Sequence, residues 1–182
     1  MADLNFSALK QRAGTGESGD PRSEAEPIWD IIELLFFAYR DFVSDPDEVL
    51  GKLGFGRAHH RVLHFVNRNP AMKVANLLDI LKITKQSLGR VLKQLIDEGY
   101  IVQKEGENDR RQRLLHVTPK GEALALKLAG LQTQRILRAL EKLGPGAHDA
   151  ARQFLIAMLD AGGRDEVMRL VGHAERGPRA RS

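Results

Sequence analysis

The residues best suited to a chemical task lie on one side of the segment 85–94. Leu88, Val91 and Leu95 recur at helical spacing and predict a helix with one packed face. The opposite face has no acidic residue before Asp97 and carries cations, amides and one glycine: Lys85, Gln86, Gly89, Arg90, Lys93 and Gln94. Lysine and arginine pair with phosphates, arginine and glutamine hydrogen-bond base edges, and glycine permits close approach. We therefore expect this face to contact duplex DNA, because an ordinary solvated face would include glutamate.

A second charged group lies in the polar loop 105–113. The loop joins two short apolar segments, 101–104 and 114–117, which predict the strands of a β-hairpin. One acidic and three basic side chains stand in its second half: Asp109, Arg110, Arg111 and Arg113. The pattern predicts a hairpin with a basic tip.

Local signals also predict the elements that position these groups. Val74, Leu77 and Leu81 recur at helical spacing just before the basic face. Thr84 is a favourable N-cap and Ile83 precedes it, so a second helix is expected to start there at a new angle. Two short helices joined by a turn of about three residues form a helix-turn-helix.

Longer helices are predicted on both sides of this motif. Pro27 and Asp45-Pro46 bracket a strongly apolar helix of about 18 residues, because proline suits a first helical turn and interrupts a helix interior. Further helices are expected over 57–67, 119–143 and 151–159, with an extension of the last past Gly162-Gly163 to Val171 left open. The predicted fold class is mostly α with a small β-hairpin wing, which is a winged helix-turn-helix.

The composition excludes several classes of protein. The 182 residues are 42% hydrophobic and 29% charged and include no cysteine, which excludes disulfides, thiolate zinc sites, iron–sulfur clusters and thiol redox sensors. The first residues lack the order of a signal peptide, and the apolar stretch 28–43 carries four charged side chains. We expect a cytoplasmic protein without a membrane partner.

The charges are distributed unevenly along the chain. Residues 1–50 hold 4 basic and 11 acidic side chains, residues 51–122 hold 14 and 7, and residues 123–182 hold 10 and 6. The formal net charge of +4 therefore hides a basic middle segment. Such a segment is typical of a polyanion-binding protein, although a solvated surface would also account for it.

No catalytic, metal or cofactor site is expected. His59, His60 and His64 are the best candidates for zinc ligands, but no third or fourth ligand of another type stands nearby. Three arginines lie among them and would oppose a cation: Arg57, Arg61 and Arg68. Paired carboxylates, a Ser/His/Asp set and a phosphate loop are missing in any convincing context, so an enzyme is not expected.

The order of these elements resembles the MarR family of winged-helix transcription regulators over about residues 27–160. The most specific match is the segment 109–121, which has an Asp, an Arg two positions later, an alternating apolar strand and then Thr, Lys and Gly. Segments 56–61 and 83–88 are similar to the PetP-like branch of the family. One departure is Lys82, where the family often has glycine, and a different backbone geometry in the turn would accommodate it.

The resemblance implies an obligate homodimer whose first and last helices interleave. Two winged heads would then meet successive major grooves of a pseudo-palindromic operator, with half-sites about 34 Å apart. The chain is expected to divide into a flexible arm (1–26), a dimerisation helix (27–50), a winged helix-turn-helix (51–122), C-terminal dimerisation helices (123–171) and a flexible basic tail (172–182).

The resemblance also implies roles for individual side chains. The base edges of the major groove would be contacted by Lys85, Gln86 and Arg90, and the phosphates by Thr84, Ser87 and Lys93. In the wing, Arg111 would enter the minor groove with Asp109 orienting its guanidinium, while Arg110 and Arg113 would pair with phosphates. A local ion pair between Asp109 and Arg111 that only shapes the loop is the alternative.

Members of the family often bind small apolar anions between the dimer helices and the winged head. The corresponding lining here would come from aromatic side chains of the first helix and two histidines: Trp29, Phe36, Phe37, Tyr39, His60 and His64. The same residues would equally form plain core. A winged-helix module that binds protein or structured RNA is the alternative function, and the acid-free basic face argues against it.

Overall fold

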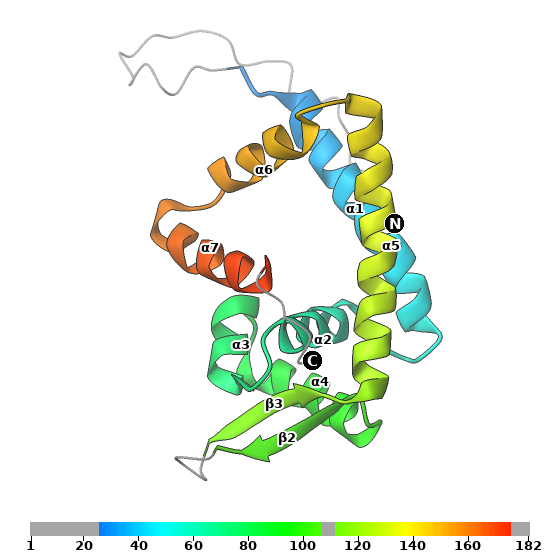
Figure 1. Cartoon of the computed structure of the whole chain (residues 1–182), viewed down its shortest axis with the longest axis vertical. Coiled ribbons are helices and arrows are strands. Elements are labelled where there is room, and N and C mark those ends of the chain that lie inside the picture. The colour runs from blue at the N-terminus through cyan, green and yellow to red at the C-terminus, as the bar shows by residue number, and fades with distance from the viewer. Residues whose placement is uncertain (1–25, 107–111, 176–182) are drawn as a thin grey trace, which may run out of the picture. The chain divides into compact units, whose positions relative to one another are not determined.

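The structure is a computed structural model that describes residues 26–106 and 112–175 (Figure 1). The described chain divides into two units between Phe36 and Phe37. Helices dominate it and one small sheet accompanies them, which confirms the predicted fold class. In chain order the elements are α1 (Trp29–Gly51), α2 (Arg57–Arg68), β1 (Met72–Lys73), α3 (Val74–Leu81), α4 (Lys85–Asp97), β2 (Ile101–Glu105), β3 (Arg113–Val117), α5 (Pro119–Leu143), α6 (Ala147–Ala157) and α7 (Ala161–Glu175).

The sheet is antiparallel and has the strand order β1-β3-β2. The predicted hairpin is confirmed, and each of its strands is one residue longer than expected, through Glu105 and Arg113. No local signal predicted β1, because two residues are too few to show a period. In β1, Met72 is buried and pairs with Leu115 of β3, so the strand ties the start of α3 to the wing.

The helix-turn-helix is formed by α3 and α4, as predicted. The Thr84 hydroxyl accepts a hydrogen bond from the Ser87 amide at 3.1 Å and caps α4. Lys82 in the turn has φ 51° and ψ 42°, which is the left-handed conformation that glycine adopts most readily. The different geometry expected for this departure is therefore wrong: the lysine adopts the conformation that a glycine would.

The hydrophobic core lies among the helices and strands of the winged head. Its fully buried members come from α2, α3, α4, the sheet, the first half of α5 and, through Leu50, the end of α1. They include Val62, Leu63, Val66, Leu77, Leu88, Leu95, Ile101, Leu115 and Leu128. Because α4 places Leu88, Leu92 and Leu95 on one face in this core, its opposite face must point away from the core.

A short motif at the start of α5 joins the wing to the end of α4. The Thr118 hydroxyl accepts a hydrogen bond from the Gly121 amide at 3.1 Å and caps α5. Lys120 Nζ donates to the Glu98 carbonyl at 2.8 Å and lies 4.1 Å from the centre of the Tyr100 ring. The Thr, Lys and Gly of the predicted wing signature therefore have structural tasks at this junction.

α1 differs from the prediction at both ends, since it begins at Trp29 and continues through Pro46 to Gly51. Proline in a helix interior costs about 3 kcal/mol because it removes a hydrogen bond and crowds the preceding turn. Pro46 and Leu50 are fully buried, and burial of such side chains offsets a cost of that size. The helix end is thus decided by the core and not by the proline.

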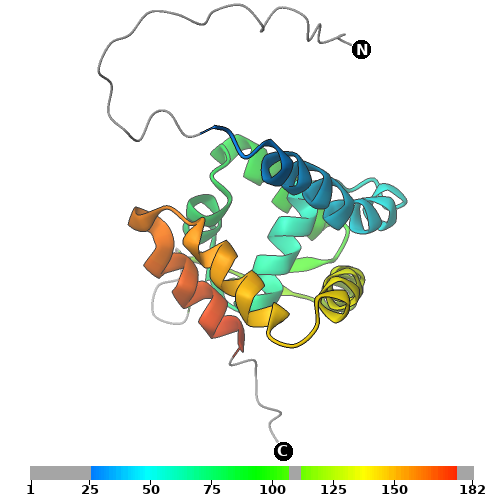
Figure 2. The same cartoon turned by 90° about the horizontal axis from the view of Figure 1, so that it is seen from above.

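The C-terminal region forms two helices, and the single extended helix left open in the sequence is wrong. Figure 2 shows α6 and α7 as separate helices with a bend between them. The Arg164 guanidinium donates to the carbonyls of Leu159 at 2.8 Å and Ala157 at 3.4 Å, which satisfies acceptors at the end of α6.

α7 continues to Glu175, so residues 172–175 of the predicted tail are helical. The rest of that tail, and all of the predicted arm except residue 26, lie outside the described residues. Among the described residues, no helix combines the length and apolar character needed to span a membrane.

Candidate nucleic-acid interface

The exposed face of α4 carries three side chains with no intramolecular partner. Lys85, Gln86 and Arg90 are exposed, and none of them forms a hydrogen bond or ion pair within residues 26–106 and 112–175. Gly89 lies between them, and a Cβ added there would meet no atom within 4 Å. The packing of the chain itself therefore does not require glycine at this position, which leaves room for an external surface to approach the backbone.

Two hydroxyl groups lie at the start of this face. Ser87 is half-buried, and its hydroxyl accepts a hydrogen bond from the Thr84 hydroxyl at 3.0 Å. The Thr84 oxygen in turn accepts from the Ser87 amide. The Thr84 proton is therefore committed within the cap, while the Ser87 hydroxyl keeps its own proton for donation to an external acceptor.

The far end of the face differs from the sequence expectation. Lys93 forms an exposed ion pair with Asp97 one turn later. The side chain of Gln94 is hydrogen-bonded to His59 at 2.9 Å and to Glu98 at 3.1 Å, so it is turned toward α2. The unpartnered part of the face therefore ends at Arg90, and Lys93 would have to exchange one anionic partner for another.

The wing is described only at its base. Asp109, Arg110 and Arg111 lie outside the described residues. Arg113 on β3 pairs with Glu105 on β2 at 2.9 Å, and this exposed ion pair crosses the hairpin just before its tip. A backbone hydrogen bond from Gly106 to the Gln112 carbonyl at 3.1 Å closes the same end. Arg113 thus has a partner in the hairpin and would have to leave Glu105 to reach a phosphate.

Three of the six residues predicted to line a ligand pocket do lie together. Tyr39, His60 and His64 line a cavity of about 270 Å³ formed by α1, α2 and α5. Its cationic lining comes from two further residues that the pocket prediction missed, Arg57 and Arg61. They follow from helical spacing, since a face that presents His60 and His64 also presents residues three and four positions away.

The other three predicted pocket residues are not part of this cavity. Phe37 is 54% exposed and absent from its lining. Trp29 and Phe36 belong to the other unit of the chain and are 63% and 70% exposed. Their exposure also contradicts the alternative interpretation of these aromatic residues as core of a single chain.

Burial affects the two histidines of the cavity. It lowers the pKa of His60 below the ordinary 6.5, and the nearby His64 lowers it further against a smaller opposing effect of Asp47. Burial also lowers the pKa of His64, and the Arg68 charge acts in the same direction. Both imidazoles are therefore held neutral near pH 7, so they offer this cavity hydrogen bonds and not positive charge.

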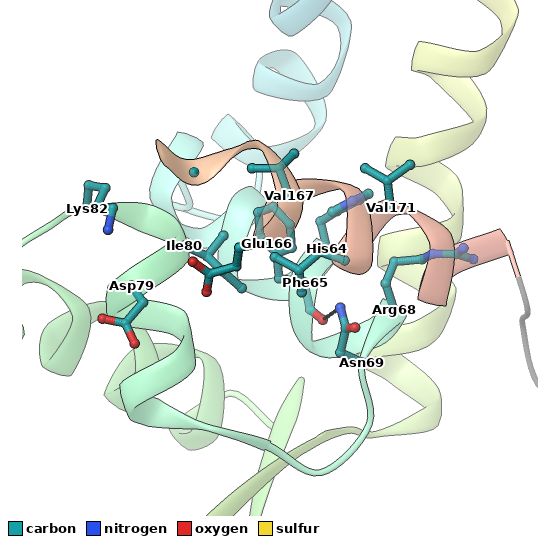
Figure 3. Close-up of a pocket in the computed structure, with 12 residues that line it drawn as sticks. His64, Phe65, Arg68, Asn69, Asp79, Ile80, Lys82, Glu166, Val167 and Val171 are labelled. Atoms are coloured by element: carbon teal, nitrogen blue, oxygen red, sulfur yellow. Dashed lines mark hydrogen bonds between the residues drawn. The ribbon is translucent and has the colours of Figure 1, made fainter. Parts of the chain in front are cut away.

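A second cavity of about 470 Å³ lies between α2, α3 and α7 (Figure 3). Its walls are mainly apolar, with Phe65 and Ile80 opposite Val167. The Asn69 side chain at its edge donates to the Phe65 carbonyl at 3.0 Å and caps the end of α2. Sequence reasoning missed this cavity because it did not separate α7 from α6.

The histidines do not form a metal site in the part of the chain that the structure covers. No group of three or more histidine, aspartate or glutamate side chains there has the arrangement of a metal site. Nearby, Arg57 pairs with Asp47 at 2.8 Å, and this contact raises the pKa of the guanidinium. The surroundings of His60 and His64 are thus arranged around arginines.

Comparisons with known proteins identify relatives of the whole arrangement. A sequence profile of the MarR family matches residues 53–112. The HTH-type transcriptional regulator PetP of Rhodobacter capsulatus is 47% identical over 129 residues, which span 71% of this chain and 78% of PetP.

Two solved structures share the fold at low sequence identity. A MarR family regulator from Listeria monocytogenes, solved in complex with 26mer DNA, gives a TM-score of 0.63 at 20% identity and covers 87% of this chain and 100% of its own. A MarR family protein from Mycobacterium tuberculosis, in complex with salicylic acid, gives 0.54 at 20% identity, with 75% and 98% covered. The fold is therefore that of a winged helix, and the identity to PetP over most of both sequences shows that the chain belongs to the MarR family of transcriptional regulators.

Proposed function

We propose that this regulator binds a specific DNA duplex as a homodimer, with α4 in the major groove and the wing in the adjacent minor groove. The observation that carries the proposal is the unpartnered face of α4. Lys85, Gln86 and Arg90 are exposed and make no hydrogen bond or ion pair among the described residues. Side chains of these types hydrogen-bond base edges, and on this face no other group of the described chain occupies them.

The roles of the remaining residues follow from their positions. Ser87 and the α4 N-terminus would meet phosphate, and Lys93 would add a second phosphate contact after leaving Asp97. In the wing, Arg111 would enter the minor groove with Asp109 orienting it. Phosphate contacts of the wing would come from Arg110 and, after release from Glu105, Arg113.

The exposed apolar residues of the long helices support the homodimer. Many large apolar side chains of α1, α5 and α6 are exposed to solvent, more than the surface of a monomeric protein usually exposes. They include Trp29, Leu34 and Phe36 on α1, Leu126, Leu137 and Leu143 on α5, and Phe154 and Leu155 on α6. A second copy would cover such faces, and its symmetry would require a pseudo-palindromic site with half-sites about 34 Å apart.

The dimer proposal assigns tasks to the parts of the chain. Residues 27–50 and 123–171 would join the two copies, and residues 51–122 would bind DNA. Light scattering of the purified chain should give the mass of two copies. Exchanging Leu137 for Glu should produce single copies, because a buried carboxylate would have no partner in the apolar contact.

We also propose that the cavity of Tyr39, His60 and His64 takes a small apolar anion. Arg61 provides positive charge at its wall, Arg57 beside it is paired with Asp47, and the aromatic ring and imidazoles provide apolar contact. The relative from Mycobacterium tuberculosis that was solved with salicylic acid supports a ligand of this class. Bound ligand would raise the melting temperature of the wild type and have no such effect on an Arg61→Ala variant.

The decisive experiment is selection of duplexes from a randomised library by the wild-type protein. An inverted repeat should be enriched, and affinity for it should fall steeply between about 50 and 200 mM salt, because several phosphates are neutralised. An Arg90→Ala variant should lose the enrichment, while Lys127→Ala, which removes an exposed cation from α5, should retain it. Absence of any enriched sequence would contradict the proposal and favour a protein-binding or RNA-binding module.

A further inference from the structure

A side-chain hydrogen bond joins α2 to α4, the helix that we propose enters the major groove. Nε2 of the His59 imidazole lies 2.9 Å from the side-chain oxygen of Gln94. On its other side, Nδ1 accepts the backbone N–H of Gly56 at 3.1 Å. Since a backbone amide can only donate, Nδ1 is the acceptor, and the ring proton is on Nε2, where it points at Gln94.

The amide of Gln94 is fixed from both ends. Its oxygen accepts from His59, and its nitrogen donates to the Glu98 carboxylate at 3.1 Å one turn later on α4. Rotating the amide by half a turn would place its NH₂ group against the Nε2 proton of His59. The hydrogen bonds to His59 and Glu98 can therefore both form in only one orientation of the Gln94 amide.

The ring of His59 is itself held against the core. It stacks on Phe55 with centroids 4.8 Å apart and planes 11° apart, and Phe55 is buried. Phe55 in turn meets Tyr100 edge to face at 5.2 Å. These ring contacts thus hold the His59 imidazole, and with it the Nε2 proton, in one position.

The hydrogen bond between His59 and Gln94 bears on how α4 is oriented against α2. α2 and α4 otherwise pack through apolar side chains, which are non-directional and tolerate small rotations of one helix against the other. No other side-chain hydrogen bond joins these two helices among the described residues. Gln94 stands one turn beyond Arg90, so a bond that fixes Gln94 also fixes the direction in which Arg90 leaves the helix.

We propose that His59 is a positioning residue for DNA recognition, which through Gln94 sets the rotation of α4 against α2 and so the alignment of Arg90 and Gln86 with the bases. The inference rests on the proposed function. It also removes Gln94 from the set of base-reading residues, although glutamine is a common adenine reader.

The test uses variants that separate the hydrogen bond from the ring. His59→Phe keeps the stacking on Phe55 and removes both nitrogens. Gln94→Met keeps the size of the side chain and removes the acceptor. His59→Gln keeps a donor of similar reach. Each variant is measured for affinity toward the duplex that the wild type enriches, toward a shuffled duplex of equal length, and for thermal stability.

His59→Phe should lower affinity for the enriched duplex by about three- to tenfold, the effect of one lost hydrogen bond, and leave the shuffled duplex and the salt dependence unchanged. Gln94→Met should do the same, the double variant should be no worse than either single variant, and His59→Gln should restore most of the loss. A purely structural role would change stability without changing the ratio between the two duplexes.

The inference is overturned if His59→Phe keeps the wild-type ratio between the duplexes, or if its effect adds fully to that of Gln94→Met. Additive losses would mean that Gln94 contacts DNA directly. If the wild type enriches no duplex at all, the proposed function fails first and the inference fails with it.

Discussion

The carbonyl oxygen of Tyr100 lies 2.0 Å from the position that a Cβ would occupy on Gly121. No real Cβ tolerates such a contact, and the obstructing atom belongs to the backbone where the wing leaves α4. The glycine therefore permits α5 to start against the hairpin, with the Lys120 ammonium over the Tyr100 ring beside it.

Gly121→Ala should destabilise the protein by about 2–3 kcal/mol, because the junction must open to admit the methyl group. Chemical denaturation of the variant measures this loss. Gly130→Ala, on the same helix with no atom within 4 Å of an added Cβ, serves as the control. It should stabilise the helix by about 0.5–1 kcal/mol, and equal effects at both positions would contradict the steric explanation.

The turn before α4 holds Lys82 in the left-handed region, with its amide donating to the Leu78 carbonyl at 3.0 Å. A side chain with a Cβ is strained there, and glycine is not. Lys82→Gly should therefore raise the free energy of unfolding by about 0.5–1 kcal/mol, as measured in urea. Lys82→Ala removes the same charge but keeps the strain, so a similar gain from alanine would assign the effect to charge.

Local sequence signals predicted the parts of the fold that local forces decide. The Thr84 cap, the leucine face of α4 and the hairpin all depend on residues within a few positions of one another. The passage of α1 through Pro46 depends on the core that receives Leu50, and the bend after α6 depends on Arg164 reaching back to carbonyls of the preceding turn. Such contacts have no periodicity to detect.

The same distinction applies to the candidate site. Residue types and helical spacing were enough to predict that Lys85, Gln86 and Arg90 share the face expected to contact DNA. The partner of Gln94 could not be identified in this way, since His59 lies 35 positions earlier in the chain. The spacing of the histidine cluster made it a candidate zinc site, which the surrounding arginines argued against, but nothing in that spacing showed which residue His59 would contact.

The lowered pKa values of His60 and His64 predict loss of stability in acid. Both groups have folded-state pKa values below the ordinary 6.5, so below about pH 6.5 the unfolded chain binds more protons than the folded one. Stability contributed by the neutral rings is present above that pH and is lost as pH falls toward the folded pKa values. The melting temperature should therefore decline between about pH 7 and pH 5.

Replacing the histidines tests this explanation of the acid dependence. His64→Gln should make the decline shallower, and exchanging both His60 and His64 for glutamine should make it shallower again. An unchanged slope in the double variant would assign the acid dependence to other groups, such as Asp41 on α1, whose pKa is lowered by its hydrogen bond with Arg40.

Arg90 and Lys93 stand three residues apart on α4 and should respond differently to removal. Arg90 has no partner among the described residues and is suited to hydrogen-bond base edges. Lys93 forms an ion pair with the Asp97 carboxylate and is suited to bind phosphate. Arg90→Ala should cost about 1–3 kcal/mol on the enriched duplex and relax the preference at one base position. Lys93→Ala should weaken all duplexes alike and reduce the slope of log affinity against log salt by about one. Titrations of each variant with the enriched and shuffled duplexes at several salt concentrations separate the two effects. If Arg90→Ala weakened both duplexes equally, Arg90 would be a phosphate contact, and the major-groove contact would depend on Lys85 and Gln86 alone.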